Sequence, residues 1–306
     1  MTGMRLLVAG DKSQAGKSTV SMGLLGALLE AGFLASDIAY IKPATQCVSS
    51  TLTARFCETR GIAYEHIGPV VFYRGFTRER LDALGDASDC SPPPLTGGAA
   101  PDGDDLVAAC AEAVERISEG KRVTIIDGVG YPSVGSIVRC SSADIAVACG
   151  AAVLVVGKSG VGDAVDSFNL CARYFEAQHV PVIGAIFNKV APTGFYGLPA
   201  VGAYLRRYMA HARPRQRVYG LLPAAEALGA LGADEACALA FKRPETTPRA
   251  GQLSPEDEKV VALVAEMFRE QIDVKALLAD LEAALASPAD WVQMLPKFAG
   301  ATTVDG

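Results

Sequence analysis

The chain has 306 residues, of which 50% are hydrophobic and 20% are charged, with a formal net charge of −6 at pH 7. This composition excludes an intrinsically disordered chain, which would be less hydrophobic and more charged. The acidic balance provides no general attraction for nucleic acid or anionic lipid, so neither is an expected partner. The longest apolar run, residues 145–156, is shorter than the roughly 18 residues of a membrane-spanning helix.

The cysteines and histidines give no sign of a metal or redox site. The eight cysteines are scattered without a Cys-x-x-Cys pair, and the three histidines show no paired spacing. Residues 1–5 lead directly into a short apolar strand, a pattern that predicts no signal peptide. We therefore expect a cytoplasmic protein with a large buried core.

Short apolar runs alternate with segments of helical periodicity in the first half of the chain. Strands are predicted at residues 5–9, 38–41 and 123–126. Helices are predicted at about 17–31, 51–60 and 104–119. Between them, residues 84–103 contain Pro92-Pro93-Pro94 and several glycines, a composition typical of a loop.

The same alternation continues in the second half. Strands are predicted at 152–156, 182–187 and 217–221, with a helix at about 163–177. The strands are uninterrupted apolar runs, as in a parallel sheet that is buried on both faces. Strand–helix alternation with such strands predicts an α/β fold, a doubly wound and mainly parallel sheet.

The composition changes past Arg243, where a Pro- and Thr-rich connector leads to two helices. Ser254 and Pro255 begin the first helix as N-cap and first-turn proline, and Asp273 caps the second. Two helices of this length can hardly bury their apolar faces alone. We therefore predict an α/β domain at 1–243 and a helical C-terminal extension at 244–306 that packs on it, frayed from about residue 301.

The strongest motif lies between the first strand and the first helix, at Gly10-Asp11-Lys12-Ser13-Gln14-Ala15-Gly16-Lys17-Ser18. It fits G-x-x-x-x-G-K-S/T, the phosphate-binding loop or P-loop. Its glycines allow consecutive backbone N–H groups to surround phosphate oxygens, and the helix N-terminus adds partial positive charge. Lys17 would reach the β- and γ-phosphates, and the Ser18 hydroxyl would ligate Mg²⁺. The predicted nucleotide-binding residues of this segment are Gly10, Ser13, Gln14, Ala15, Gly16, Lys17, Ser18 and Thr19.

Further segments resemble motifs of the dethiobiotin synthetase family and of the related cobyrinic acid a,c-diamide synthases, in the same order. Ile41-Lys42-Pro43 resembles a Lys-Pro whose lysine binds the substrate carbamate or carboxylate beside the γ-phosphate. Ile126-Asp127-Gly128-Val129-Gly130 is similar to a segment whose acid is a Mg²⁺ ligand, which implies that role for Asp127. Asn188-Lys189 and Leu222-Pro223 resemble the segments that recognise and line the adenine.

The resemblance covers about residues 4–285 and implies a P-loop NTPase fold, ATP and Mg²⁺ as cofactors, and a ligase reaction. A small-molecule carboxylate or carbamate would attack the γ-phosphate, and the mixed anhydride would then react with an amine. Catalysis would consist mainly of positioning and charge neutralisation, with Lys17 on the phosphates and Lys42 on the incoming acid. Related enzymes dimerise, which implies a homodimer here.

The chain also departs from this family around the substrate. Ser13 and Gln14 replace a threonine and a glutamate of the family's P-loop, and residues 44–57 contain no acid where the family has a second Mg²⁺ carboxylate. Beyond Ser18 and Asp127, Mg²⁺ would rely on phosphate oxygens and water, with Glu58 or Asp11 as further candidates. The substrate pocket is therefore different, and dethiobiotin is not the predicted product.

Lys12 leaves a second function open. It stands five residues before Lys17, where the plasmid-partition and nitrogenase-iron-protein ATPases have a signature lysine that acts across a dimer. Because Ser13-Gln14 replaces the glycine pair of that motif, a solvated loop lysine is an equal alternative. With the signature role, Lys12 would be catalytic in a dimeric ATPase switch or a regulatory nucleotide-binding protein. A nucleotide-binding pseudoenzyme is a third alternative.

One basic cluster is present in this acidic chain. It consists of Arg206, Arg207, Arg213, Arg215 and Arg217. We interpret the cluster as the solvated end of a helix rather than as a nucleic-acid site.

Overall fold

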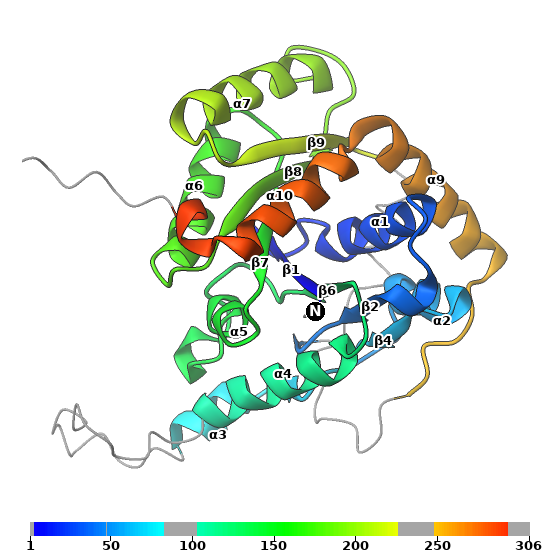
Figure 1. Ribbon diagram of the computed structural model, residues 1–306, viewed down its shortest axis with the longest axis vertical. Helices are drawn as coiled ribbons and strands as arrows, with labels where there is room; N and C mark the ends of the chain where they lie inside the picture. The colour runs from blue at the N-terminus through cyan, green and yellow to red at the C-terminus, as the bar shows by residue number, and fades with distance from the viewer. Residues whose placement is uncertain (1–2, 47, 83–102, 226–247, 293–306) are drawn as a thin grey trace, which may run out of the picture.

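The computed structural model describes residues 3–46, 48–82, 103–225 and 248–292 (Figure 1). Its centre is a parallel sheet of seven strands in the order β4-β2-β6-β1-β7-β8-β9. The strands are β1 (Met4–Gly10), β2 (Ile38–Ile41), β4 (Ala63–Glu65), β6 (Val123–Asp127), β7 (Ala152–Gly157), β8 (Val182–Val190) and β9 (Arg217–Pro223). A second, two-stranded sheet pairs β3 (Ala44–Thr45) with β5 (Val70–Val71). The predicted doubly wound α/β fold with a helical C-terminal region is confirmed.

Helices follow most strands and cover both faces of the sheet (Figure 1). They are α1 (Lys17–Glu30), α2 (Leu52–Arg60), α3 (Phe76–Asp82), α4 (Gly103–Ser118), α5 (Ser142–Ala148), α6 (Gly162–Glu176), α7 (Leu198–Ala212), α9 (Pro255–Gln271) and α10 (Val274–Ala286). Short 3-10 turns lie at Ala35–Asp37, Ser136–Val138 and Pro288–Trp291.

Alternate residues of the central strands divide the core into two layers. Leu7 and Ala9 of β1 pack with residues of α4, α5, α6 and α7 on one face. Leu6 and Val8 pack with residues of α1, α2, α9 and α10 on the other face. This division follows from the two-residue period of a strand, and it explains why the strands read as continuous apolar runs.

The observed elements differ from the predicted ones at the sheet edges. β4 was not predicted because Ala63-Tyr64-Glu65 is short and only partly buried, as an edge strand can be. β8 continues past the predicted end at residue 187 to Val190, and β9 extends to Pro223. A proline is tolerated there because β9 is the other edge strand. Helix α3 and the small sheet are also additions to the prediction, which placed the end of a helix at the arginine cluster but gave no bounds for α7.

The C-terminal helices pack directly on the helix that follows the P-loop. The Phe268 ring of α9 lies against Gly23 of α1, and residues of α1, α9 and α10 share one buried cluster. The predicted caps are present: the Ser254 hydroxyl accepts a hydrogen bond from Asp257 N, and the Asp273 carboxylate accepts one from Ala276 N. The predicted boundary at 243–244, the tail from 301 and nearly all of the predicted loop at 84–103 lie outside the described residues.

Candidate functional site

The P-loop connects β1 to α1 with the backbone that its glycines permit. Gly16 directly precedes α1 in the left-handed region, with a φ of 94°. A Cβ atom there would lie 2.1 Å from the Asn188 side-chain nitrogen, so only glycine fits. Asn188 Nδ2 donates to Ala15 O (2.9 Å), and Lys189 Nζ donates to Gln14 O (2.9 Å). The end of β8 therefore holds the P-loop through these two hydrogen bonds.

The predicted nucleotide-binding residues of the P-loop lie together at the carboxyl end of β1. Lys12, Ser13 and Gln14 are exposed, whereas Ala15 is buried. Asn188 is almost fully buried and its amide is bonded within the protein, so its contact with adenine stays a prediction. Leu222 and Pro223 lie at the end of the edge strand β9.

Lys17 is the first residue of α1 and is held in a desolvated position. Burial lowers the pKa of its ammonium group, and the nearby positive charge of Lys42 lowers it further. The carboxylates of Asp127 and Asp11 act in the opposite direction. Two lysines near one buried carboxylate make an electropositive site, which the negative phosphates of a nucleotide would complement.

Asp127 is the centre of a compact polar cluster at the carboxyl end of β6. Its side chain is fully buried, and its Oδ2 atom accepts hydrogen bonds from the Tyr40 hydroxyl (2.8 Å) and the Ser18 hydroxyl (2.9 Å). The Lys42 ammonium lies 3.4 Å from the same oxygen and 3.3 Å from Ser18 Oγ. The structure thus brings together the predicted residues Ser18, Lys42 and Asp127, which are far apart in sequence.

The oxygens of Ser18 and Asp127 fit a magnesium ion. Adjacent ligands of an octahedral Mg²⁺ are about 3.0 Å apart when each Mg–O distance is about 2.1 Å. The observed separation of Ser18 Oγ and Asp127 Oδ2 is 2.9 Å. Asp127 Oδ1 is buried and has no hydrogen-bond partner among the described residues, which leaves that oxygen available as a further ligand.

The additional carboxylates suggested by the sequence do not join this pair. Asp11 accepts a hydrogen bond from Lys158 N (2.9 Å), and Glu58 accepts one from the Tyr64 hydroxyl. No group of three or more acidic, histidine or cysteine side chains suited to a metal occurs within the described ranges. Mg²⁺ would therefore depend on Ser18, Asp127, phosphate oxygens and water.

Three residues near the P-loop were missed by the sequence analysis. Tyr40 contacts Asp127, and its only sequence signal is its position two residues before Lys42 on the same strand face. Thr53 Oγ1 donates to Ser18 O (3.0 Å) from α2, in the segment where an acid was expected. His66 follows β4 directly, is buried, and has no hydrogen-bond partner in the described part of the chain.

His66 lies beside Lys42 at the edge of the sheet. Tyr40 pairs with Tyr64, and Lys42 N donates to Glu65 O (2.8 Å), so Lys42 and His66 are the next neighbours on these parallel strands. Burial and the charge of Lys42 lower the pKa of the His66 imidazole, while Glu58 raises it. The imidazole is therefore expected to be neutral.

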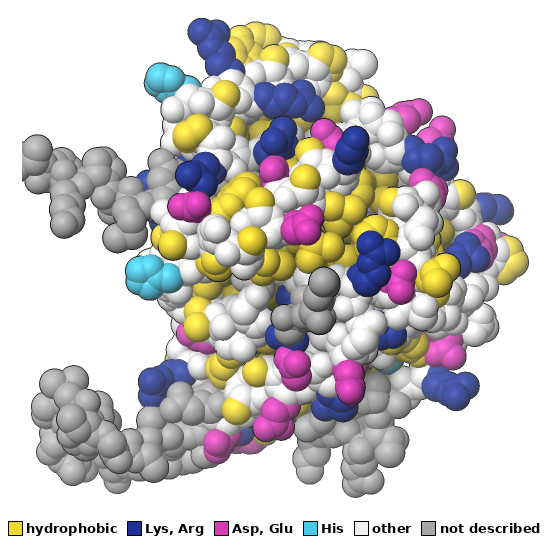
Figure 2. Space-filling view, viewed as in Figure 1, with side chains coloured by type: hydrophobic (Ala, Val, Ile, Leu, Met, Phe, Trp, Pro, Cys, Tyr) yellow, Lys and Arg dark blue, Asp and Glu magenta, His cyan; other side chains and the backbone are white. Residues whose placement is uncertain are grey.

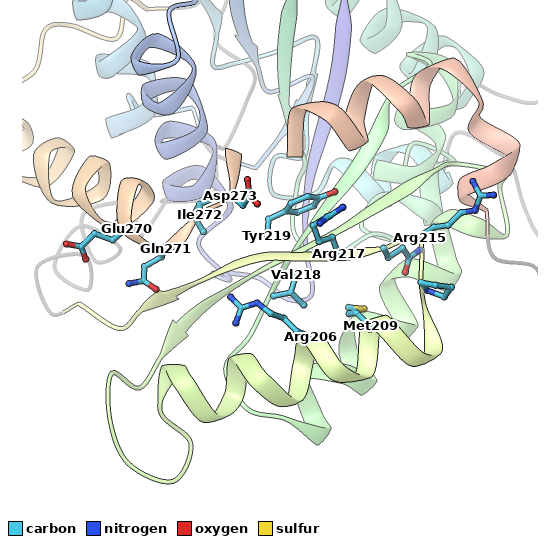
Figure 3. A pocket seen from close by; sticks show the side chains of 13 residues that line it. Arg206, Met209, Arg215, Arg217, Val218, Tyr219, Glu270, Gln271, Ile272 and Asp273 are labelled. Carbon is cyan, nitrogen blue, oxygen red and sulfur yellow. The ribbon is translucent and has the colours of Figure 1, made fainter. Parts of the chain in front are cut away.

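The arginine cluster is not a uniform basic surface. Arg213 is buried, where it donates to Glu176 (2.9 Å) and Gln216 (2.8 Å). Arg206, Arg215 and Arg217 border a groove of about 630 Å³, which Glu270 and Asp273 also line (Figure 3). Arg217 pairs with Asp280 at 2.9 Å. Basic and acidic side chains also alternate on the face seen in Figure 2.

Comparison with protein families shows the family to which the chain belongs. A family model described as an AAA domain matches residues 4–230, which is more than half of the chain. The chain belongs to this AAA domain family. Membership agrees with the P-loop geometry, and the predicted nucleotide binding is supported.

One curated relative of this AAA domain protein is a dethiobiotin synthetase, the family that the sequence was predicted to resemble. The ATP-dependent dethiobiotin synthetase BioD of Anaeromyxobacter dehalogenans (strain 2CP-C) is 26% identical over 210 residues, covering 68% of this chain and 86% of the relative. The predicted resemblance to dethiobiotin synthetases is confirmed.

Two solved structures match the chain at low sequence identity and with TM-scores below 0.5. The Cyanothece McdA–ATP complex is 14% identical, with a TM-score of 0.43, and the match covers 96% of this chain and 99% of that chain. The signal recognition particle receptor FtsY of Elizabethkingia anophelis with GDP is 13% identical, with a TM-score of 0.42. That match covers 74% of this chain and 58% of FtsY, less than two thirds of the receptor.

The length and apolar character of the helices bear on whether any of them could span a membrane. Among the described residues, no helix is both long and apolar enough to cross a membrane. This finding agrees with the apolar runs of the sequence, the longest of which divides into α5 and β7.

Proposed function

We propose that this AAA domain protein is an ATP- and Mg²⁺-dependent ligase that activates a small-molecule carboxylate or carbamate by phosphorylation. The observation that carries the proposal is the position of Lys42, 3.4 Å from Asp127 and 3.3 Å from Ser18. A lysine from a neighbouring strand at this point stands beside the expected γ-phosphate, where an attacking acid would need a positive charge. The similarity to a dethiobiotin synthetase supports the same reaction class.

The proposed roles follow from charge and position. Lys17 neutralises the β- and γ-phosphates, and Ser18 and Asp127 hold Mg²⁺. Mg²⁺ supplies charge neutralisation and orientation of the phosphates when bound. Lys42 orients the acid for in-line attack on the γ-phosphate, and catalysis then rests on positioning rather than on a general base. Asn188, Lys189, Leu222 and Pro223 complete the proposed nucleotide site.

The substrate side differs from that of a dethiobiotin synthetase. Thr53 contacts the P-loop helix from the segment in which the family carries a metal carboxylate. His66 adds a buried imidazole beside Lys42. We therefore propose an acid substrate other than the dethiobiotin precursor, bound along the carboxyl ends of β2 and β4.

A screen of acid substrates tests the proposal. Phosphate release from Mg·ATP is measured with a panel of carboxylates, amino acids and diamines with bicarbonate, each with and without an added amine. We expect at least one acid to stimulate phosphate release, Lys17→Ala to abolish it, and Lys42→Ala to remove the stimulation while nucleotide binding persists. Stimulated turnover that is unchanged in Lys42→Ala would contradict the role of that residue.

A dimeric ATPase switch is the second candidate function. Lys12 is exposed on the P-loop and forms no hydrogen bond or ion pair with the described residues, so its ammonium is available to a partner. In this case ATP, but not ADP, would induce a homodimer, and Lys12→Ala would abolish it. Light scattering with a non-hydrolysable ATP analogue distinguishes the two candidates, because the ligase requires no nucleotide-dependent change in mass.

A further inference from the structure

The Lys42 ammonium contacts Asp127 Oδ2 and Ser18 Oγ, the two oxygens to which we assign Mg²⁺. It is 3.4 Å from Asp127 Oδ2 and 3.3 Å from Ser18 Oγ, and only 15% of the Lys42 side-chain surface is exposed. In this arrangement, the lysine supplies the positive charge that the buried carboxylate requires. A metal ion at this oxygen pair would supply the same charge.

The carboxylate oxygen cannot serve all of its partners and a metal as well. Asp127 Oδ2 already accepts from the Tyr40 and Ser18 hydroxyls and contacts the Lys42 ammonium. A carboxylate oxygen has about two lone-pair sites, so a metal bound to it must displace at least one partner. Lys42 makes the longest of the three contacts, has the most flexible side chain, and is the partner with the same sign of charge as Mg²⁺.

We propose that Lys42 and Mg²⁺ compete for the Ser18–Asp127 oxygen pair, and that Mg·nucleotide binding displaces the Lys42 ammonium toward the substrate side. The backbone of Lys42 stays in place because its N–H donates to Glu65 O (2.8 Å), so only the side chain moves. His66 stands beside it directly after the neighbouring strand β4, with ring nitrogens that have no partner among the described residues. The displaced ammonium therefore remains within reach of a polar acceptor.

The competition orders the binding of the two substrates. This step rests on the proposed ligase function. Lys42 is available to the acid substrate only after Mg·ATP has taken the oxygen pair, so the acid binds second. Ordered binding would limit unproductive binding of the acid to a site without a phosphoryl donor.

Manganese binding to the full chain tests the competition without nucleotide or acid substrate. Free Mn²⁺ is measured by electron paramagnetic resonance during titration of the wild type and of Lys42→Met and Lys42→Gln, two neutral variants of similar length. We expect both variants to bind Mn²⁺ at least about fivefold more tightly than the wild type, the lower end of typical couplings between sites. Lys158→Met is the matched control, because Lys158 pairs with Asp163 (2.8 Å) and lies outside the oxygen pair; its affinity should be unchanged.

The location of the bound metal is tested in the same assay. Adding Asp127→Asn to Lys42→Met should remove the gain in Mn²⁺ affinity. Unchanged or weaker binding in both neutral variants overturns the proposal, and so does a gain that persists with Asp127→Asn. Because the titration contains no acid, a failed substrate screen leaves this result standing, and a failed titration leaves the ligase proposal standing.

Discussion

Gly23 and Gly26 lie one turn apart in α1, and their replacement by alanine should have opposite effects on stability. A Cβ atom at Gly23 would lie 2.1, 2.4 and 2.5 Å from three carbons of the Phe268 ring in α9. At Gly26, the nearest atom to such a Cβ is Phe56 Cζ, at 3.8 Å, which is an ordinary contact. The pair therefore tests whether the C-terminal helices pack closely on the helix that carries the P-loop.

The magnitudes follow from these distances. Carbon atoms pack at about 3.5 Å or more, so Gly23→Ala must push the Phe268 ring back by about 1.4 Å. Phe268 is 1% exposed, and overpacking of a buried ring of this kind costs about 1–3 kcal/mol. The higher helix propensity of alanine offsets at most about 1 kcal/mol of this cost. Gly26→Ala has the same gain without the clash, and should stabilise the protein by about 0.5–1 kcal/mol.

Urea denaturation monitored by two signals measures both variants. The single tryptophan, Trp291, is almost buried at the end of the helical extension, so its fluorescence reports on that region, while circular dichroism reports on the whole fold. We expect the free energy of unfolding to fall in Gly23→Ala and to rise in Gly26→Ala. Adding Phe268→Leu to Gly23→Ala should cost less than the sum of the two changes. A Gly23→Ala protein as stable as Gly26→Ala would refute the close packing.

Three further changes have definite expected outcomes. Gly16→Ala should abolish binding of a fluorescent ATP analogue, because its Cβ would lie 2.1 Å from Asn188 Nδ2 and the φ of 94° is strained for alanine; retained affinity would contradict this. His66 has a lowered pKa in the folded state, so the unfolded chain takes up its proton first as the pH falls below about 6.5. The free energy of unfolding should therefore decrease from pH 7.5 to 5.5, and less steeply in His66→Gln. Arg213→Met removes one of the two arginines that pair with the buried carboxylate of Glu176, which keeps Arg173 at 3.2 Å, and should cost about 1.5–3 kcal/mol in urea denaturation. A double variant that also carries Glu176→Gln should recover part of the loss, and no recovery would argue against the ion pair as the cause.

Much of the candidate site could be predicted because its residues sit at strand ends. The P-loop has a spacing that identifies it by itself, and Lys42 and Asp127 each follow an apolar run that the sequence marks as a strand. Parallel strands bring such ends to one edge of the sheet, so their proximity follows from the fold class. The contacts among them do not follow, because a side chain's partner depends on strand order. Only the adjacency of β2, β6 and β1 brings Tyr40, Ser18 and Lys42 to one carboxylate oxygen.

The sequence by itself determined the ends of the helices that it predicted, the buried strands and the phosphate loop of this protein. These features depend on local patterns: a capping serine at Ser254, runs of apolar residues, and glycines at fixed spacing. Tertiary structure alone decided which strands are neighbours, that a polar edge strand forms at β4, and that the His66 imidazole is buried beside Lys42. The physical reason is that register and strand order are set by contacts between distant segments. The free energy of these contacts depends on both segments together, so a short stretch of sequence does not predict it.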